Sequence, residues 1–395
     1  MRIERDRSRL SFRRRRRSGC MPLVVFLGLV TALVVGSWGW IERRLTMSGA
    51  PDDGASDLIA GARDAFARGE LEEAITLARE ALDRNPDRPD AVAVLARALV
   101  YRSYVDYDTD LDRRSALELT TDMIQRHAGD LDLRAAHAFA LSANGQPSAA
   151  AESAERVLET QPDHALARAA LALAYSVAGA HQVGLRESQR AVREHPNSVD
   201  AQRALGISYR DAADYENAVR AVENAIMLNG RLIPLHYERA LYALQLGDAD
   251  SATFAYMQVL AIDPDNVKAR LRLCELSSLL RERDAALDYC TQVIDSAPNW
   301  SEGWYQLGRE YFLQGDWVQA QSHLNQCARL QVMQDVRVEE RRFACWYLQG
   351  QAAEIRGDCP SLVAIYNEYQ AMTANRAVDE TWSYPPEGPP GCVGS

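Results

Sequence analysis

The stretch WYQLGREYFLQGDWVQA, residues 304–320, contains aromatic residues, a Leu-Gly step and an alanine at uneven intervals. The rest of the chain decides whether these residues line a pocket or serve packing. Small residues recur every 34 positions in two series that keep a constant offset of 12. The series are Ala138, Ala172, Gly206, Ala240, Cys274 and Gly308, and Ala150, Gly184, Ala218, Ala252, Ala286 and Ala320. Two series in fixed phase indicate an internal repeat.

A small residue twelve positions before another suits two helices of a hairpin, because their backbones approach closely where the side chains are short. Proline ends the second helix at the same period, at Pro162, Pro196, Pro264 and Pro298. Glycine recurs at the turn inside the hairpin, at Gly145, Gly179, Gly247 and Gly315. The pattern predicts an all-α solenoid in which each hairpin buries its apolar face only against its neighbours.

The period and its residues resemble the tetratricopeptide repeat (TPR) family. Its W-x-x-L-G-x-x-Y…A pattern is matched by Trp304, Leu307, Gly308, Tyr311 and Ala320. The resemblance implies a right-handed superhelical solenoid of TPR helical hairpins over residues 55–372, with about eight to nine repeats. We expect units at 55–88, 89–130, 131–164, 165–198, 199–232, 233–266, 267–300 and 301–334, and a degenerate unit near 343–372. Residues 304–320 are then packing positions.

Both ends of this array depart from the pattern. The second unit reaches its next small residue, Ala116, eight positions late. The ninth unit has Leu362 where a small residue is expected, so we expect its hairpin to be splayed or to act as a cap. Residues 373–395 contain four prolines and three glycines, which predicts an extended or mobile tail.

The N-terminus carries nine arginines between positions 2 and 17, followed by residues 21–41, which hold no charge. As a helix, the uncharged segment would span about 30 Å, the thickness of a bilayer core. The arginine bias predicts that residues 1–20 stay cytoplasmic, that 21–41 form a transmembrane helix, and that a linker (42–54) and the repeats lie outside the cytoplasm.

Two alternative interpretations of this end are less favoured. Cleavage as a signal peptide after the small pair Ser48 and Ala50 is disfavoured by Pro51. Nucleic-acid binding explains arginines next to an apolar segment less well than membrane orientation does. Beyond residue 44 the chain has 33 basic and 52 acidic residues, a balance that disfavours nucleic acid and favours basic partners or divalent cations.

The second unit is eight residues longer than the repeat requires, and this insertion contains four aspartates at alternate positions: Asp106, Asp108, Asp110 and Asp112. A calcium loop starting at Asp106 needs glycine at its sixth position and glutamate at its twelfth, where Leu111 and Leu117 stand. We therefore expect an acidic, solvated extension of a hairpin rather than a Ca²⁺ site.

Six cysteines follow the apolar segment: Cys274, Cys290, Cys327, Cys345, Cys359 and Cys392. An even number on an oxidising side permits disulfides, and we predict at least one, with Cys274 and Cys290 as the favoured pair because both lie in one hairpin. Free buried thiols are the alternative. The sequence contains no C-x-x-C, H-E-x-x-H, G-x-S-x-G or phosphate-binding loop, so we predict no catalytic residue, cofactor or metal site.

The first helix of each hairpin is expected to line the concave side of the solenoid. The candidate groove residues are Phe139, Leu173, Arg203, Ile207, Arg210, Tyr237, Leu241, Arg272, Tyr305, Arg309 and Phe312. The family resemblance implies that such a groove holds a peptide or helix of a partner protein. We expect a membrane-tethered scaffold without catalysis, whose partner offers an apolar segment with acidic groups to the groove arginines. The alternative is an accessory subunit of a membrane-bound complex for envelope biogenesis or protein maturation.

Overall fold

The computed structural model describes residues 54–105, 110–374, 382–384, 389 and 392. The expected cytoplasmic segment 1–20, transmembrane helix 21–41 and nearly all of the linker 42–54 lie outside these residues. None of the helices in the described part is long and apolar enough to cross a bilayer. The chain divides into the units Met1–Asp53 and Gly54–Ser395, and the description below concerns the second.

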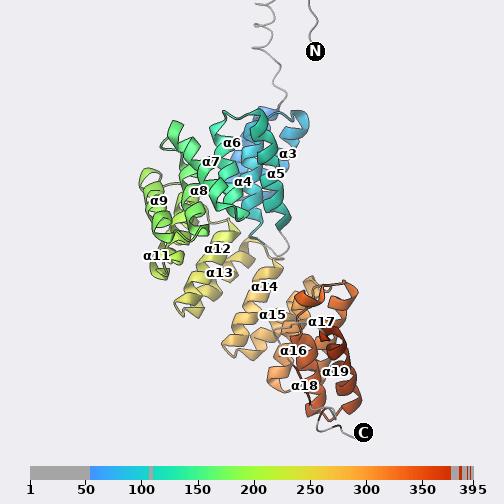
Figure 1. Ribbon diagram of the computed structural model, residues 1–395. Coiled ribbons are helices and arrows are strands. Elements are labelled where there is room, and N and C mark those ends of the chain that lie inside the picture. The colour runs from blue at the N-terminus through green and yellow to red at the C-terminus, as the bar shows by residue number, and fades with distance from the viewer. Residues whose placement is uncertain (1–53, 106–109, 375–381, 385–388, 390–391, 393–395) are drawn as a thin grey trace, which may run out of the picture. The chain divides into compact units, whose positions relative to one another are not determined.

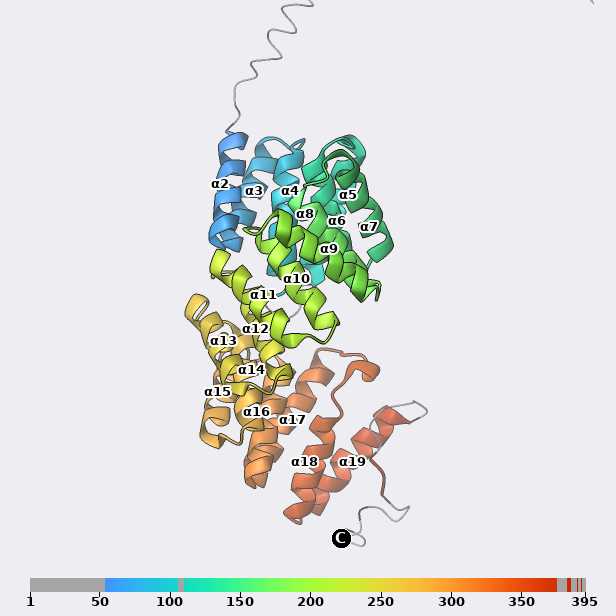
Figure 2. The same cartoon turned by 90° about the vertical axis from the view of Figure 1, so that its left-hand side faces the viewer.

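The described residues of the second unit form eighteen α-helices and one short 3-10 helix, with no strand. The α-helices follow one another in nine pairs, which Figures 1 and 2 show from two sides. The pairs are α2 (Ala55–Arg68) and α3 (Leu71–Arg84); α4 (Pro89–Arg102) and α5 (Asp110–Arg126); α6 (Leu131–Ala143) and α7 (Pro147–Thr160); α8 (Ala165–Val177) and α9 (His181–Glu194); α10 (Val199–Asp211) and α11 (Tyr215–Leu228); α12 (Ile233–Gln245) and α13 (Ala249–Ile262); α14 (Val267–Leu279) and α15 (Arg283–Ser296); α16 (Ser301–Gln314) and α17 (Trp317–Met333); α18 (Ala344–Ile355) and α19 (Cys359–Thr373). The 3-10 helix η1 (Val338–Glu340) lies between α17 and α18. The prediction of an all-α solenoid is confirmed.

The small residues of the repeat lie where the two helices of a hairpin meet. A Cβ atom added to Gly308 of α16 would lie 2.7 Å from Leu324 Cγ and 3.0 Å from the Leu324 backbone nitrogen in α17. A Cβ at Gly206 of α10 would lie 2.8 Å from Val222 Cγ2 in α11. A larger side chain at either position would push the two helices apart, so Gly308 and Gly206 serve the close packing of the two helices in their hairpins.

In eight of the nine helix pairs, the described turn between the two helices contains a left-handed residue. Gly315 supplies it after α16 with φ = 83°. Where the repeat lacks glycine, Ala213 and Arg281 adopt φ values of 58° and 63° at the equivalent turns. This conformation is unfavourable for residues with a Cβ, so the packing of the hairpin imposes it.

The first helices of the early pairs stack directly, α4 on α6, α6 on α8 and α8 on α10. The backbone of α12 does not pack as closely on α10 or on α14 as in this stack, and α12 contacts α10 through side chains such as the Arg203–Glu238 pair. Side chains after α10 then reach back to the start of the unit: Asn229 Nδ2 donates to the carbonyl of Ala67 at 3.0 Å, and Lys268 Nζ donates to the carbonyl of Tyr104 at 2.8 Å. The first superhelical turn is therefore closed by contacts between residues more than 150 positions apart.

The ninth hairpin is closed by the C-terminal tail. Trp382 is buried, and its ring centroid lies 5.1 Å from that of Tyr366 and 5.5 Å from that of Tyr369 in α19. A Cβ added to Gly350 of α18 would lie 2.7 Å from Trp382 Cζ2, so the indole contacts both helices. The tail was expected to be extended or mobile; of its described residues, Trp382 packs against α18 and α19 of the ninth hairpin.

Candidate functional site

The eleven groove candidates fall into three groups in the structure. Five of them line a cavity of about 330 Å³ enclosed by the first superhelical turn: Phe139, Leu173, Arg203, Ile207 and Arg210. A second group lines a groove of about 380 Å³ between α12 and α14: Tyr237, Leu241 and Arg272. The third group lies on α16 and lines neither: Tyr305, Arg309 and Phe312. The structure therefore does not bring the eleven residues into one continuous strip.

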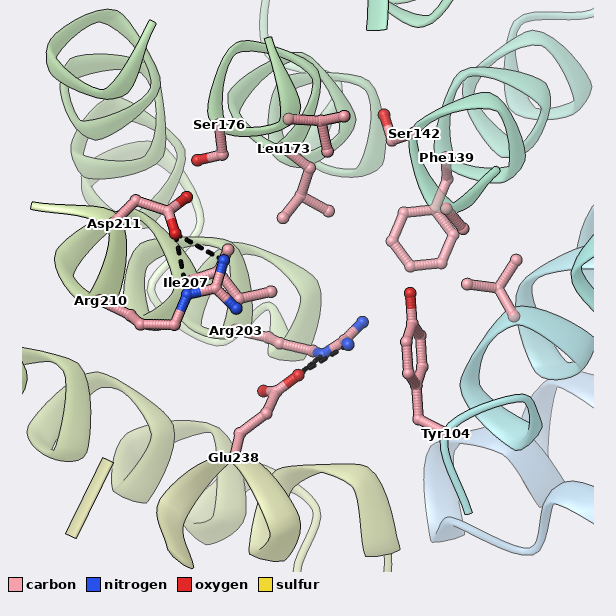
Figure 3. Close-up of a pocket in the computed structure, with 13 residues that line it drawn as sticks. Tyr104, Phe139, Ser142, Leu173, Ser176, Arg203, Ile207, Arg210, Asp211 and Glu238 are labelled. Atoms are coloured by element: carbon pink, nitrogen blue, oxygen red, sulfur yellow. Dashed lines mark hydrogen bonds and ion pairs between the residues drawn. The ribbon is translucent and has the colours of Figure 1, made fainter. Parts of the chain in front are cut away.

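The cavity in the first turn (called the first-turn cavity below) has an apolar and a polar side (Figure 3). Phe139 and Leu173, from α6 and α8, form part of the apolar side. Arg203 and Arg210 of α10 and Glu238 of α12 form the polar side. Phe139 is only 2% exposed and Arg203 only 5%, so these two residues are interior rather than exposed groove residues.

Arg203 is held in place from two directions. Its Nε and a terminal nitrogen each lie 2.7 Å from Glu238 Oε1, and its guanidinium carbon lies 5.0 Å and 4.9 Å from the ring centroids of Tyr101 and Tyr104. Burial acts to lower the pKa of Arg203, but the carboxylate of Glu238 and the two tyrosines raise it above its usual value. Arg203 therefore stays charged and fixed at the α10–α12 junction.

The α12–α14 groove is open and mostly apolar. It is lined by Tyr237, Leu241, Leu244, Tyr256, Leu276 and Leu279, with Lys268, Arg272 and Glu275 as its polar members. Leu279 is 76% exposed and Leu241 45% exposed. The Tyr237 hydroxyl donates to Asn266 Oδ1 at 2.6 Å, and Lys268 Nζ lies 4.5 Å from the centroid of the Tyr237 ring. These contacts fix the tyrosine at the edge of the groove.

The α16 candidates take part in packing within their own hairpin and against its neighbours. The guanidinium of Arg342 lies 4.5 Å from the ring centroid of Tyr305, and Phe312 meets Trp317 edge-on at 5.0 Å. Arg309 donates to Ser278 Oγ at 3.1 Å. Sequence reasoning did not anticipate these partners, because most of them come from neighbouring hairpins.

Each of the four groove arginines lies beside a carboxylate. The nitrogen-to-oxygen distances are 2.7 Å for Arg203–Glu238, 2.5 Å for Arg210–Asp211, 2.7 Å for Arg272–Glu275 and 3.6 Å for Arg309–Glu310. A carboxylate therefore offsets part of the positive charge of each concave arginine, and a partner with acidic groups stays a prediction.

Two of the four acidic-insertion residues are described, and both pair with arginine. Asp112 accepts from Arg102 Nε at 2.7 Å, and Asp110 pairs with Arg113. Asp106 and Asp108 lie outside the described residues. Within the described ranges no group of three His, Cys, Asp or Glu side chains is arranged to hold a metal ion.

All six cysteines after the apolar segment are paired in disulfides. Cys274 and Cys290 join α14 to α15, with their Cα atoms 5.1 Å apart. Cys327 and Cys345 join α17 to α18, and Cys359 at the start of α19 is joined to Cys392 in the tail. The sequence favoured only the first pair, because the other two link separate hairpins or the tail.

Comparison with known proteins agrees with this architecture. Models of the tetratricopeptide repeat match residues 59–101, 136–199, 203–267 and 243–305. No curated protein sequence matches the chain.

The solved structures that are similar to this chain have low sequence identity to it. The Cut9 and Hcn1 hetero-tetramer of APC/C is 16% identical with a TM-score of 0.50, over 77% of this chain and 57% of that chain, so the present chain spans little more than half of it. A thermophilic TPR protein of Thermus thermophilus is 24% identical over 46% of this chain and 98% of its own, with a TM-score of 0.38. YrrB, described as a TPR protein with an unusual peptide-binding site, is 18% identical over 46% and 93%, with a TM-score of 0.39. Together with the matched repeats, the hairpin geometry establishes that the chain belongs to the tetratricopeptide repeat family.

Proposed function

We propose that this protein is a membrane-tethered TPR scaffold that binds partner proteins on the extracytoplasmic side and has no catalysis of its own. The observation that carries the proposal is the open α12–α14 groove, where Leu241 and Leu279 are exposed beside aromatic and charged side chains. The accessory-subunit alternative differs only in the identity of the partner, which would then be a chain of a membrane-bound enzyme.

The groove has the composition of a protein-binding site. Removing exposed apolar surface from water contributes about 25 cal/mol per Å² of favourable free energy to the binding of a partner. Tyrosine and arginine, which dominate binding energy in protein interfaces, flank the leucines here as Tyr237, Tyr256 and Arg272. An apolar segment of a partner protein, as a helix or an extended peptide, fits this surface.

The tether and its side of the membrane are supported by two independent features. The arginine cluster followed by uncharged residues 21–41 is typical of a segment inserted with its N-terminus in the cytoplasm. The three disulfides of the second unit are typical of proteins that mature in an oxidising compartment. A scaffold facing away from the cytoplasm accounts for both features together.

Site-specific photo-crosslinking in cells that make the full-length chain tests the proposal. A photoreactive residue at position 241 or 279 should capture the same partner protein, because both leucines face the groove. The matched control is position 111, where Leu111 of α5 is also exposed but lies outside the groove. Failure of both groove positions to crosslink, or equal capture from position 111, would contradict the assignment.

A further inference from the structure

The ninth hairpin holds three residues of the tail in the way that a receptor holds an extended peptide. Trp382, Ser383 and Tyr384 have neither helical nor strand structure. Trp382 is buried, Ser383 is exposed, and the ring centroid of Tyr384 lies 5.0 Å from that of Tyr366 in α19. Residues 382 and 384 therefore face the hairpin while the residue between them faces solvent, which is the alternation of an extended segment.

Side chains of α19 hold the main chain of this segment. The backbone nitrogen of Trp382 donates to the Tyr369 hydroxyl at 3.1 Å, and that of Tyr384 donates to the Tyr366 hydroxyl at 3.1 Å. Gln370 Nε2 donates to the Trp382 carbonyl at 3.1 Å. Every peptide has these main-chain groups, so the three hydrogen bonds do not depend on which chain supplies the segment.

The two aromatic side chains of the segment supply specificity. The indole of Trp382 lies over Gly350 of α18, where a Cβ atom would come within 2.7 Å of its Cζ2 atom, and it meets the ring of Tyr347 edge-on at 5.8 Å. The Tyr384 hydroxyl donates to Glu354 Oε2 at 2.7 Å. All these partners belong to α18 and α19, so the two helices form the site and the tail only fills it.

We propose that the α18–α19 hairpin is a binding site for an extended segment of a partner protein with the pattern aromatic-x-tyrosine, and that residues 382–384 occupy it as an intramolecular ligand. The site shares no residue with the first-turn cavity or the α12–α14 groove, so it goes beyond the proposed function. The tail competes with the partner, because a ligand on the same chain acts at an effective concentration of about millimolar. The Cys359–Cys392 disulfide is a second tether of the tail and strengthens this competition.

Fluorescence anisotropy of a labelled peptide with the sequence of residues 379–387 tests the inference on the full-length chain in detergent. The receptor is the variant Trp382→Ala/Tyr384→Ala, which keeps the disulfide but lacks the side chains that fill the site. We expect it to bind the peptide at least tenfold more tightly than the unaltered chain does, because its own tail no longer competes. Cys359→Ser/Cys392→Ser, which removes one tether of the tail, should fall between the two.

Matched changes locate the binding. Adding Gly350→Leu to the receptor variant places a side chain where the indole lay, so it should abolish binding without separating the helices. Gln370→Ala removes one main-chain hydrogen bond at an exposed position and should weaken binding about fivefold. A peptide with alanine in place of Trp382, and one with its two aromatic residues adjacent, should each bind at least tenfold more weakly.

Hydrogen exchange keeps the test decisive if the ninth hairpin of the receptor variant is partly unfolded, because saturating peptide should then slow exchange in α18 and α19. Neither binding nor slowing overturns the inference and leaves the tail as part of the fold alone. Equal binding of the peptide with adjacent aromatic residues overturns it as well, since the contact is then unspecific.

Dimers of the unaltered chain linked by a disulfide between Cys359 of one copy and Cys392 of another, seen on a non-reducing gel, would assign the site to a second copy instead of a partner protein. Photo-crosslinking from position 241 reports on the α12–α14 groove alone, so the proposed function stands or fails separately.

Discussion

Asp200 is the residue that ties the two ends of the first superhelical turn together. It is 4% exposed, and its carboxylate pairs with Arg97 and accepts from the Tyr101 hydroxyl at 2.8 Å, both on α4. The guanidinium of Arg97 also lies 4.1 Å from the centroid of the Phe66 ring. Burial, together with the negative charge of Asp200, raises the pKa of Tyr101 well above its usual value, so the tyrosine remains a donor.

Replacing Asp200 by asparagine should lower the free energy of unfolding by about 3 kcal/mol, because Arg97 then loses its partner at a largely buried site. Urea unfolding followed by circular dichroism measures the change. Asp265→Asn is the matched control, since Asp265 is 98% exposed and lies 3.6 Å from Arg270, and its midpoint should not move. Equal midpoints for the two variants would show that the cross-turn contact does not stabilise the unit.

At the scale of helices, the last hairpin of the array needs a cover for its outer face, which an interior hairpin does not need. An interior hairpin is covered on both sides by neighbours, whereas the last one leaves a face without a following repeat. Trp382 supplies that cover from the tail: its backbone nitrogen donates to the Tyr369 hydroxyl at 3.1 Å. The Tyr384 hydroxyl donates to Glu354 Oε2 at 2.7 Å, and the Cys359–Cys392 disulfide anchors the segment.

Trp382→Ala should therefore destabilise the ninth hairpin locally by about 3 kcal/mol or more, the range found for large aromatic residues removed from a core. Hydrogen exchange of α18 and α19 should accelerate while that of α6–α9 stays unchanged, because repeats contact only their neighbours. Trp317→Ala is the control: it should accelerate exchange around α16 and α17, where Trp317 contacts Phe312. Unchanged exchange in α18 and α19 of the Trp382 variant would mean that the tail is not a cap.

At the scale of the whole described unit, two different kinds of interaction stabilise the N-terminal and the C-terminal hairpins. The first turn is closed by cross-turn contacts such as Arg97–Asp200 and Asn229–Ala67. In the last three pairs and the tail, one disulfide instead lies within the α14–α15 pair, one joins α17 to α18, and one joins α19 to the tail. Because a disulfide restricts the unfolded chain, it stabilises hairpins that gain no such long-range contacts.

The full-length chain, made in its own cell and denatured without reductant, should titrate no thiol among the six cysteines after residue 44. Cys20 is the seventh cysteine and lies outside the described residues, so at most one thiol should react. The same chain made in a reducing cytoplasm should titrate all seven and serves as the control. Six or seven reactive thiols in the native preparation would contradict both the pairing and the proposed extracytoplasmic side.

The sequence alone determined the hairpins and their register. The reason is local: a close helix contact such as Gly308 with Leu324 involves residues 16 positions apart, and it recurs with the repeat. The pair Cys274 and Cys290 was favoured on the same grounds, since 16 positions separate them within one hairpin. Residues 16 positions apart lie within one 34-residue unit, so the sequence of that unit is enough to predict their contact.

Only the tertiary structure decided which concave residues are available to a partner. Phe139 and Arg203 are interior because small rotations between successive hairpins add up until α10 meets α4. Tyr305 is a packing residue because Arg342, just before α18 in the next pair, lies over its ring. Arg97 and Asp200 are 103 positions apart, and no single repeat contains the information that they pair. The position of Trp382 is likewise invisible in the repeat, because it depends on the gap that the last hairpin leaves. The sequence of each unit determines the packing within its hairpin, whereas closure of the first superhelical turn depends on the rotations between all the hairpins in that turn.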